Sequence, residues 1–147
     1  MTAHEYLSQY LALDCDVARW RREIKKARSV GQWKDAPLPI SNPGGRGGPS
    51  AQTLGDLMSA IIIQKVDGDI RRVRALEDRV EAALERQLRI VHAIDAVPSN
   101  VSRRMLDMRY LQGMRNEDIA EAMQVSVSTV RRFLTQGLSW VVDDEVN

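Results

Sequence analysis

The chain has 147 residues, enough for one compact domain or two small ones; 44% of them are apolar but only 5% are aromatic. Its 21 basic and 20 acidic residues leave a net charge of +1, which excludes a protein that coats polyanions through a large positive excess. No apolar run reaches the ~18 residues of a membrane span, and the single cysteine, Cys15, provides neither a disulfide nor a metal cluster. Since the aliphatic composition favours helix packing, we expect an all-α, cytoplasmic protein without cofactor, metal or membrane contact.

The first 30 residues predict a long amphipathic helix. Its apolar residues recur at alternating spacings of four and three, at Tyr6, Tyr10, Leu13, Val17, Trp20, Ile24 and Ala27. This heptad pattern is typical of a coiled-coil face. The opposite face carries the basic residues Arg19, Arg21, Arg22, Lys25, Lys26 and Arg28. We interpret that face as solvated, with the long side-chain stems lying along the helix.

Residues 31–52 are rich in glycine and proline and predict a linker. After it, the chain predicts a second long helix from Leu54 to about Ala93. A second apolar stripe follows that helix, at Val66, Ile70, Val73, Val80, Leu84, Val91 and Ile94. We therefore predict a long coiled-coil-like helical hairpin over residues 1–98. The two helices can pair within one chain or between two chains of a dimer.

The hairpin is predicted to end before Pro98, because the residue that precedes a proline avoids the α conformation. Ser99 or Asn100 can cap a further helix, which we expect to run to about Leu111. Gly113 is then suited to a left-handed C-terminal turn.

A helix-turn-helix pattern follows, within a domain that we assign to residues 99–142. Asn116 is predicted to cap a short helix, Gln124 and Val125 to form a turn whose valine fills the corner, and Ser126 to cap a second helix. The inward-facing residues are Ile119, Ala120, Met123, Val130, Phe133, Leu134 and Leu138. We expect Trp140 to close this small core, and residues 143–147 to form an acidic tail.

The solvent face of the second helix provides the candidate DNA-binding residues: Ser126, Val127, Ser128, Arg131, Arg132 and Thr135. A polar helix N-terminus can reach base edges in the major groove, while the arginines behind it contact phosphate or guanine. A three-helix bundle that keeps this packing without binding DNA is the alternative interpretation.

Three segments carry a family resemblance: RYLQG at 109–113, EDIAEAM at 117–123 and VSVSTVRR at 125–132. They resemble region 4 of σ70-type factors, and the layout of the chain is similar to phage-encoded late transcription regulators of the RinA/ArpU type. The resemblance implies that the second helix contacts promoter DNA. Gln124 stands where a glycine is common, so its turn must tolerate a non-glycine residue. Because Val127 and Ser128 replace charged σ residues, the σ sequence preference is not expected here.

These features predict a sequence-specific DNA-binding transcription regulator of phage or prophage origin, acting as a homodimer on double-stranded DNA, with RNA polymerase as a second candidate partner. The alternatives are a protein-interaction module that binds polymerase or a σ factor, and a DNA-packaging component. His4, His92 and Cys15 lack neighbours at catalytic or metal-ligand spacing, so we expect no enzyme activity.

Overall fold

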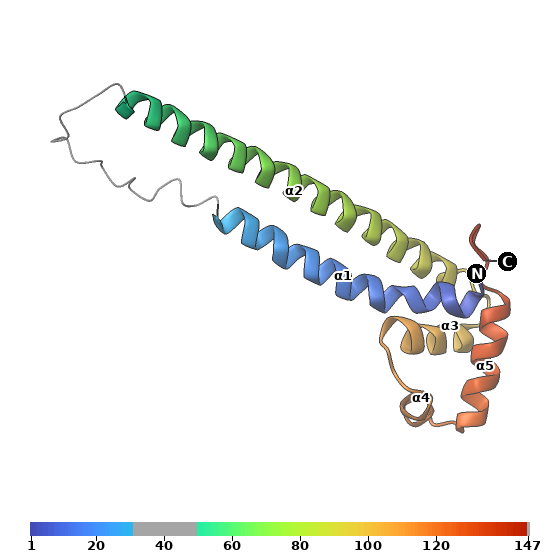
Figure 1. Ribbon diagram of the computed structural model, residues 1–147. Helices are drawn as coiled ribbons and strands as arrows, with labels where there is room; N and C mark the ends of the chain where they lie inside the picture. Colours follow the sequence, from blue (N-terminus) through green and yellow to red (C-terminus); the bar gives the residue numbers. More distant parts are fainter. Residues whose placement is uncertain (31–49, 147) are drawn as a thin grey trace. The chain divides into compact units, whose positions relative to one another are not determined.

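The computed structural model describes residues 1–30 and 50–146, and the side chains of residues 1–29 and 56–146. The predicted linker, residues 31–52, lies almost wholly outside the described part. The elements are α1 (Ala3–Val30), α2 (Ser50–Asp95), α3 (Asn100–Leu106), the π-helical turn η2 (Asp107–Leu111), α4 (Asn116–Met123) and α5 (Val127–Ser139), shown in Figure 1. No strand occurs among the described residues, and two long helices precede several short ones. The predicted all-α fold class is therefore confirmed.

Two helix boundaries differ from the prediction. Helix α2 begins at Ser50 rather than at Leu54. The helix expected from Ser99 to Leu111 is divided into α3 and η2, because the Gln112 N–H donates to the Asp107 carbonyl five residues earlier, at 3.1 Å. Two local signals are confirmed. The Ser99 Oγ accepts a hydrogen bond from the Ser102 N–H at 3.3 Å, and Gly113 adopts a φ of +71°.

Contacts between residues divide the chain into two compact units. The first unit contains Met1–Ala18 and Glu81–Asn147, and the second contains Arg19–Val80. The first unit therefore combines the start of α1 and the end of α2 with all of the short helices. The division into residues 1–98, 99–142 and 143–147 as separate parts stays a prediction.

The first unit has a continuous apolar core. Its buried residues are Tyr6, Leu7, Ile90, Ala93, Ile94, Val97, Met105, Leu106, Tyr110, Ile119, Ala120, Val130, Leu134 and Val141. They come from α1, α2, the short helices and the segment after α5. Helices α1 and α2 are thus part of the core on which the helix-turn-helix is built. Leu7 is fully buried although it lies outside the stripe predicted for α1.

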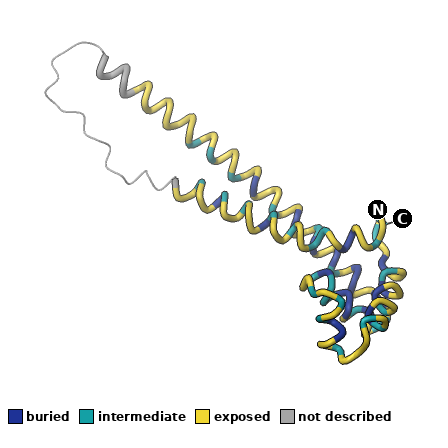
Figure 2. The backbone as a smooth tube through the Cα atoms, turned by 60° about the horizontal axis from the view of Figure 1, so that its bottom comes forward, coloured by how far each residue is buried: buried dark blue, intermediate teal, exposed yellow. Residues whose placement is uncertain are grey.

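The second unit contains the end of α1 and the beginning of α2, and it buries few side chains. Ile24 and Leu76 are buried, and Arg28 forms an ion pair with Glu77. Large apolar side chains on α2 are exposed instead, at Leu57, Met58, Ile61, Ile62, Ile63 and Ile70. Figure 2 shows the exposed colour along most of the described residues of this unit.

The apolar stripe predicted on α2 is half correct. Ile94 is buried and Val73 and Val80 are half-buried, as expected. The alternate positions are shifted: Ile70 and Leu84 are exposed, whereas the buried residues there are Leu76, Ala83 and Ile90. From the same residues spaced seven apart, an apolar stripe can step first by four residues, as predicted, or first by three, as observed. The local sequence allows both, and the packing of α2 against its neighbours selects the second.

Candidate nucleic-acid interface

Helix α4 begins with a carboxylate-rich first turn. Its N-cap is Arg115 in extended backbone conformation, so the prediction of an Asn116 cap is wrong by one residue. Asn116 is the first helical residue, and its Oδ1 is buried without a hydrogen-bond partner among the described residues. Glu117 and Asp118 lie in the first turn, where their charges interact favourably with the helix dipole. Asp118 also pairs with Arg115, the N–O distance being 3.3 Å.

The turn between α4 and α5 depends on a left-handed residue. Gln124 has φ 57° and ψ 44°, which is the conformation expected of the glycine common at this position. The Gln124 N–H donates to the Glu121 carbonyl at 3.2 Å, and the Val125 N–H donates to the Ala120 carbonyl at 3.0 Å. Val125 was expected to fill the corner, but its side chain is 37% exposed. The backbone hydrogen bonds, rather than an apolar plug, therefore close this turn.

Helix α5 is capped and packed as the sequence predicts. The Ser126 Oγ accepts a hydrogen bond from the Thr129 N–H at 3.2 Å, which satisfies one free donor at the helix N-terminus. Val130 is fully buried beneath the helix. At Gly137 a Cβ atom would lie 2.9 Å from Cδ1 of Leu106, so the absence of a side chain permits the close packing of α3 and α5.

The outward face of α5 carries most of the candidate residues. Ser128, Arg131, Arg132 and Thr135 are exposed, and their spacing of three, four and seven places them on one side of the helix. Thr135 donates a hydrogen bond from Oγ1 to the Arg131 carbonyl at 2.9 Å. The Arg132 guanidinium lies 5.2 Å from the centre of the Phe133 ring. Among the described residues, neither arginine forms an ion pair, so both charges are available to a ligand.

The two other candidates occupy different environments. Ser126 is exposed at the N-terminus of α5, where its hydroxyl is already used as the cap. Val127 is half-buried and packs against the apolar core, so only part of its side chain faces solvent.

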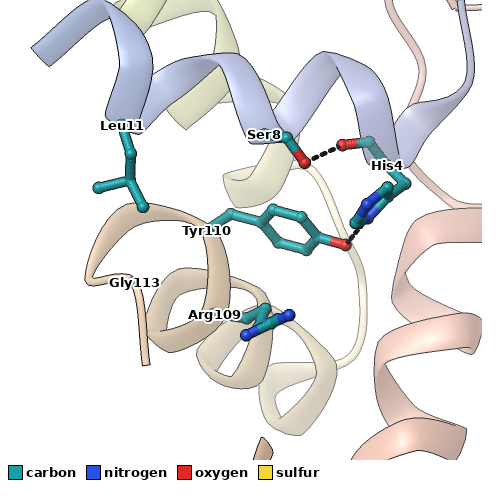
Figure 3. Close-up of a pocket in the computed structure, with 6 residues that line it drawn as sticks. All are labelled: His4, Ser8, Leu11, Arg109, Tyr110 and Gly113. Carbon is teal, nitrogen blue, oxygen red and sulfur yellow. Dashed lines mark hydrogen bonds between the residues drawn. The ribbon is translucent and has the colours of Figure 1, made fainter. Parts of the chain in front are cut away.

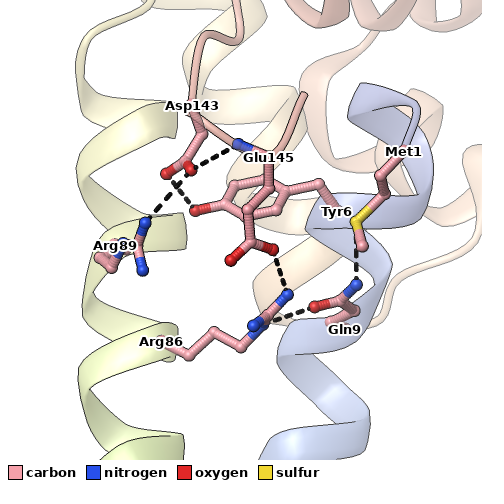
Figure 4. A network of polar contacts seen from close by, with 7 residues as sticks. All are labelled: Met1, Tyr6, Gln9, Arg86, Arg89, Asp143 and Glu145. Atoms are coloured by element: carbon pink, nitrogen blue, oxygen red, sulfur yellow. Dashed lines mark hydrogen bonds and ion pairs between the residues drawn. The ribbon is translucent and has the colours of Figure 1, made fainter. Parts of the chain in front are cut away.

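The residues after α5 attach this helix to α1 and α2. The Tyr6 hydroxyl donates to Asp143 Oδ2 at 2.5 Å, and Arg89 lies 3.4 Å from the other oxygen of that carboxylate (Figure 4). Arg86 forms an ion pair with Glu145. Burial and the Asp143 carboxylate raise the pKa of Tyr6 to about 12, while the hydrogen bond from Tyr6 lowers the pKa of Asp143.

The side chain that closes the core beside this tail is not the expected one. Val141 is buried, whereas Trp140 is 54% exposed, so the prediction for Trp140 is wrong. Helix α5 ends at Ser139, and the chain then turns so that the valine points inward. We define the tail clasp as the contacts of Tyr6, Arg86 and Arg89 with Asp143 and Glu145.

A second contact joins α1 to η2. His4 Nδ1 and the Tyr110 hydroxyl lie 2.7 Å apart in a hydrogen bond, beside a small open pocket of about 210 Å³ (Figure 3). A Cβ atom on Gly113 would lie 3.1 Å from Leu11 Cδ1 at the other end of this pocket. His4 is exposed, and no pattern within α1 points to a partner 106 residues away.

The comparisons with known proteins concern this part of the chain. Residues 87–141 match the family described as Sigma-70, region 4. No curated protein and no solved structure matches the chain. The match begins at Gln87 within α2, upstream of the motifs at 109–132, and this agrees with the burial of Ile90 and Ile94 in the same core. It supports a σ70 region 4-like helix-turn-helix in this segment, which is a kind of domain that binds DNA in transcription regulators.

Within residues 1–30 and 50–146, no helix has both the length and the apolarity needed to span a bilayer. The same residues contain no group of three or more histidine, cysteine or carboxylate side chains arranged to hold a metal ion.

Proposed function

We propose that this protein is a sequence-specific DNA-binding transcription regulator that inserts α5 into the major groove. The observation that carries this proposal is the outward face of α5. It presents two arginines without ion-pair partners among the described residues, behind a serine-capped helix N-terminus. This face lies in the segment that matches the Sigma-70 region 4 family. Both the charge and the position of the face suit contact with a duplex.

Each candidate residue has a distinct expected role. Ser126 holds the helix N-terminus beside a phosphate, and Ser128 with the exposed part of Val127 touches base edges. Arg131 and Arg132 contact phosphate or guanine, because a guanidinium can donate two parallel hydrogen bonds to either. Thr135 lies one turn further along the same face. We expect it to mark the edge of the contact.

The biological setting that we propose is late-gene regulation in a phage or prophage, within the cytoplasm of the bacterial host. Its support is the layout of long helices before a σ70 region 4-like domain, which is similar to regulators of the RinA/ArpU type. RNA polymerase is the second partner that we propose, since Sigma-70 region 4 domains bind RNA polymerase as well as DNA and residues 87–141 match that family.

We further propose a homodimer, because one short helix-turn-helix rarely binds tightly alone. The support is the exposed apolar segment of α2, residues 57–63, in which no side chain is charged. If its five large apolar side chains and Ile70 each bury roughly 100 Å², two copies bury about 1,200 Å². That area is at the lower end of stable interfaces.

The test compares the full-length chain with Arg131→Ala in DNA titrations at several salt concentrations. If Arg131 binds a phosphate, the variant weakens binding to every sequence and reduces the salt slope by about 1. If it binds a base, the loss is confined to the preferred sequence. Arg104→Ala, which removes an exposed charge from α3, is the matched control and should change neither quantity by as much. Absence of salt-dependent binding by the unaltered chain contradicts the proposal.

The same exposed apolar segment favours one competing function, a protein-interaction module whose C-terminal helices only pack. That hypothesis predicts no DNA binding and a protein partner that is captured through the long helices. A DNA-packaging component, the third hypothesis, predicts a ring larger than a dimer. Sedimentation of the purified chain, with and without DNA, separates these outcomes.

A further inference from the structure

The two units carry opposite charges although the whole chain is nearly neutral. The first unit, which contains the recognition helix, has 8 basic and 13 acidic residues, a net charge of −5. The second unit has 13 basic and 7 acidic residues, a net charge of +6. A DNA-binding protein gains most of its sequence-independent affinity from cations that neutralise phosphates. The unit with the helix-turn-helix is therefore poorly supplied with such cations.

The positive charge of the second unit is concentrated on α1. Residues 19–29 include six basic residues and a single carboxylate, Glu23, which is half-buried. We define the α1 cationic face as Arg22, Lys25 and Lys26. All three side chains are exposed. Arg22 and Lys26 each lie two positions from the buried Ile24, which places them on the opposite side of the helix.

The charges of this face are not neutralised within the described part of the chain, where Arg22, Lys25 and Lys26 form no ion pair. Two neighbouring arginines behave differently. Arg28 is paired with Glu77, and Arg19 has partners that include the Trp20 ring at 6.0 Å. For this reason neither is included in the face.

We propose that the α1 cationic face is a second DNA-binding site, which takes the phosphate backbone of double-stranded DNA without regard to sequence. This inference rests on the proposed function, since it assigns a second contact to the same ligand. Between Ala18 and Ser29, none of the exposed residues of α1 has a large apolar side chain. The cores of protein interfaces are depleted in lysine and need apolar anchors. Contacts to the phosphate backbone of DNA need only exposed cationic side chains that have no ion-pair partner.

The neighbouring segment of α2 provides an internal comparison. Residues 56–80 contain five basic and five acidic residues, so their net charge is zero. Arg71, Arg72 and Arg74 are exposed there, but Asp67, Asp69, Glu77 and Asp78 lie along the same helix. We expect carboxylates at that density to repel phosphate and to cancel the attraction of the arginines.

The experiment measures the salt dependence of binding to a non-specific duplex by the full-length chain. The variant Arg22→Gln/Lys25→Gln/Lys26→Gln keeps good helix formers at exposed positions, so the fold should be retained, which circular dichroism checks. If each cation contacts one phosphate, the salt slope falls by about 3. The affinity at 0.1 M salt should then fall by at least roughly tenfold. The ratio of specific to non-specific affinity should stay the same.

The charge-matched control is Arg71→Gln/Arg72→Gln/Arg74→Gln, which removes the same charge from α2. It should change the slope by less than about 1. An unchanged slope in the α1 variant, or an equal loss in both variants, overturns the proposal. In either case the unaltered chain still binds DNA in a salt-dependent way, so the function proposed for α5 stands. Failure of the unaltered chain to bind any duplex contradicts both proposals together.

Discussion

The two units are both helical, but they differ in packing and in charge. In the first, residues from all helices form one core, and two hydrogen-bonded contacts join α1 to η2 and to the segment after α5. In the second, α1 and α2 bury few residues, and large apolar side chains between Leu57 and Ile70 remain exposed. The first unit is acidic and the second is basic. We infer that the first unit holds the side chains that contact DNA bases. The second unit provides the cations that contact phosphates and the apolar surface through which two chains associate.

The packing of the first unit is tested most strongly by Leu106→Ala. Leu106 is fully buried, so its truncation should lower the free energy of unfolding by about 2–5 kcal/mol. Leu88, which is 57% exposed on α2, is the matched control, and Leu88→Ala should cost less than about 0.5 kcal/mol. Urea denaturation followed by circular dichroism measures both. Similar costs for the two leucines would show that the first unit lacks the core described here.

Replacing a glycine by alanine should lower the stability of the first unit but raise that of the second. Gly137→Ala places a Cβ against the fully buried Leu106 and should destabilise the first unit by about 1–2 kcal/mol. Gly68→Ala meets no atom within 4 Å on α2 and should stabilise the helix by about 1 kcal/mol. Thermal unfolding of the two variants compares them directly. Stabilisation by Gly137→Ala would contradict the close approach of α3 and α5.

A glycine at the left-handed position of the helix-turn-helix should stabilise its turn. Gln124→Gly removes the cost of placing a side chain at positive φ and should stabilise the first unit by about 1 kcal/mol. DNA affinity should not fall, because Gln124 precedes the outward face of α5. Chemical denaturation and a DNA titration of the same variant check the two statements. A destabilised variant would mean that the Gln124 side chain makes an essential contact.

An effect of similar size, but dependent on pH, is expected at the tail clasp. Tyr6→Phe removes the hydrogen bond to Asp143 and should cost about 1 kcal/mol near pH 7. Since the pKa of Tyr6 is raised from 10 to about 12, its contribution is complete below pH 10 and is lost as the pH rises through 12. The lowered pKa of Asp143 means that its contribution is present above pH 3.8 and is lost as the pH falls further. Urea denaturation as a function of pH measures both losses, and Tyr6→Phe should reduce the alkaline loss without removing it, because burial also raises the pKa of Tyr110.

The features that the sequence predicts correctly depend on a few neighbouring residues. Ser99 and Ser126 cap their helices, Gly113 turns left-handed, and Gln124 tolerates the conformation of a glycine. In each case the partner lies within about five residues, so local stereochemistry decides the outcome. The exposed positions on α5 follow from the same short-range periodicity.

The features that the sequence does not predict depend on which helix lies opposite. Leu7 is buried, Trp140 is exposed, and half of the stripe on α2 is shifted by one residue. The partners of His4 and Tyr6 lie more than 100 residues away. None of these contacts leaves a periodic signal, because packing between distant segments overrides local patterns. The charge difference between the units is visible in the sequence only after the contacts have defined them.

The most direct test of the DNA-binding proposal is selection of the full-length chain on a random double-stranded DNA pool at two salt concentrations. If α5 of a dimer reads the major groove, we expect an enriched motif that persists at the higher salt, with two half-sites about one helical turn apart. If all sequences are retained equally, and more strongly at low salt, the chain binds DNA without sequence preference, as proposed for the α1 cationic face alone. No enrichment together with no salt-dependent retention would contradict the central claim that α5 contacts DNA.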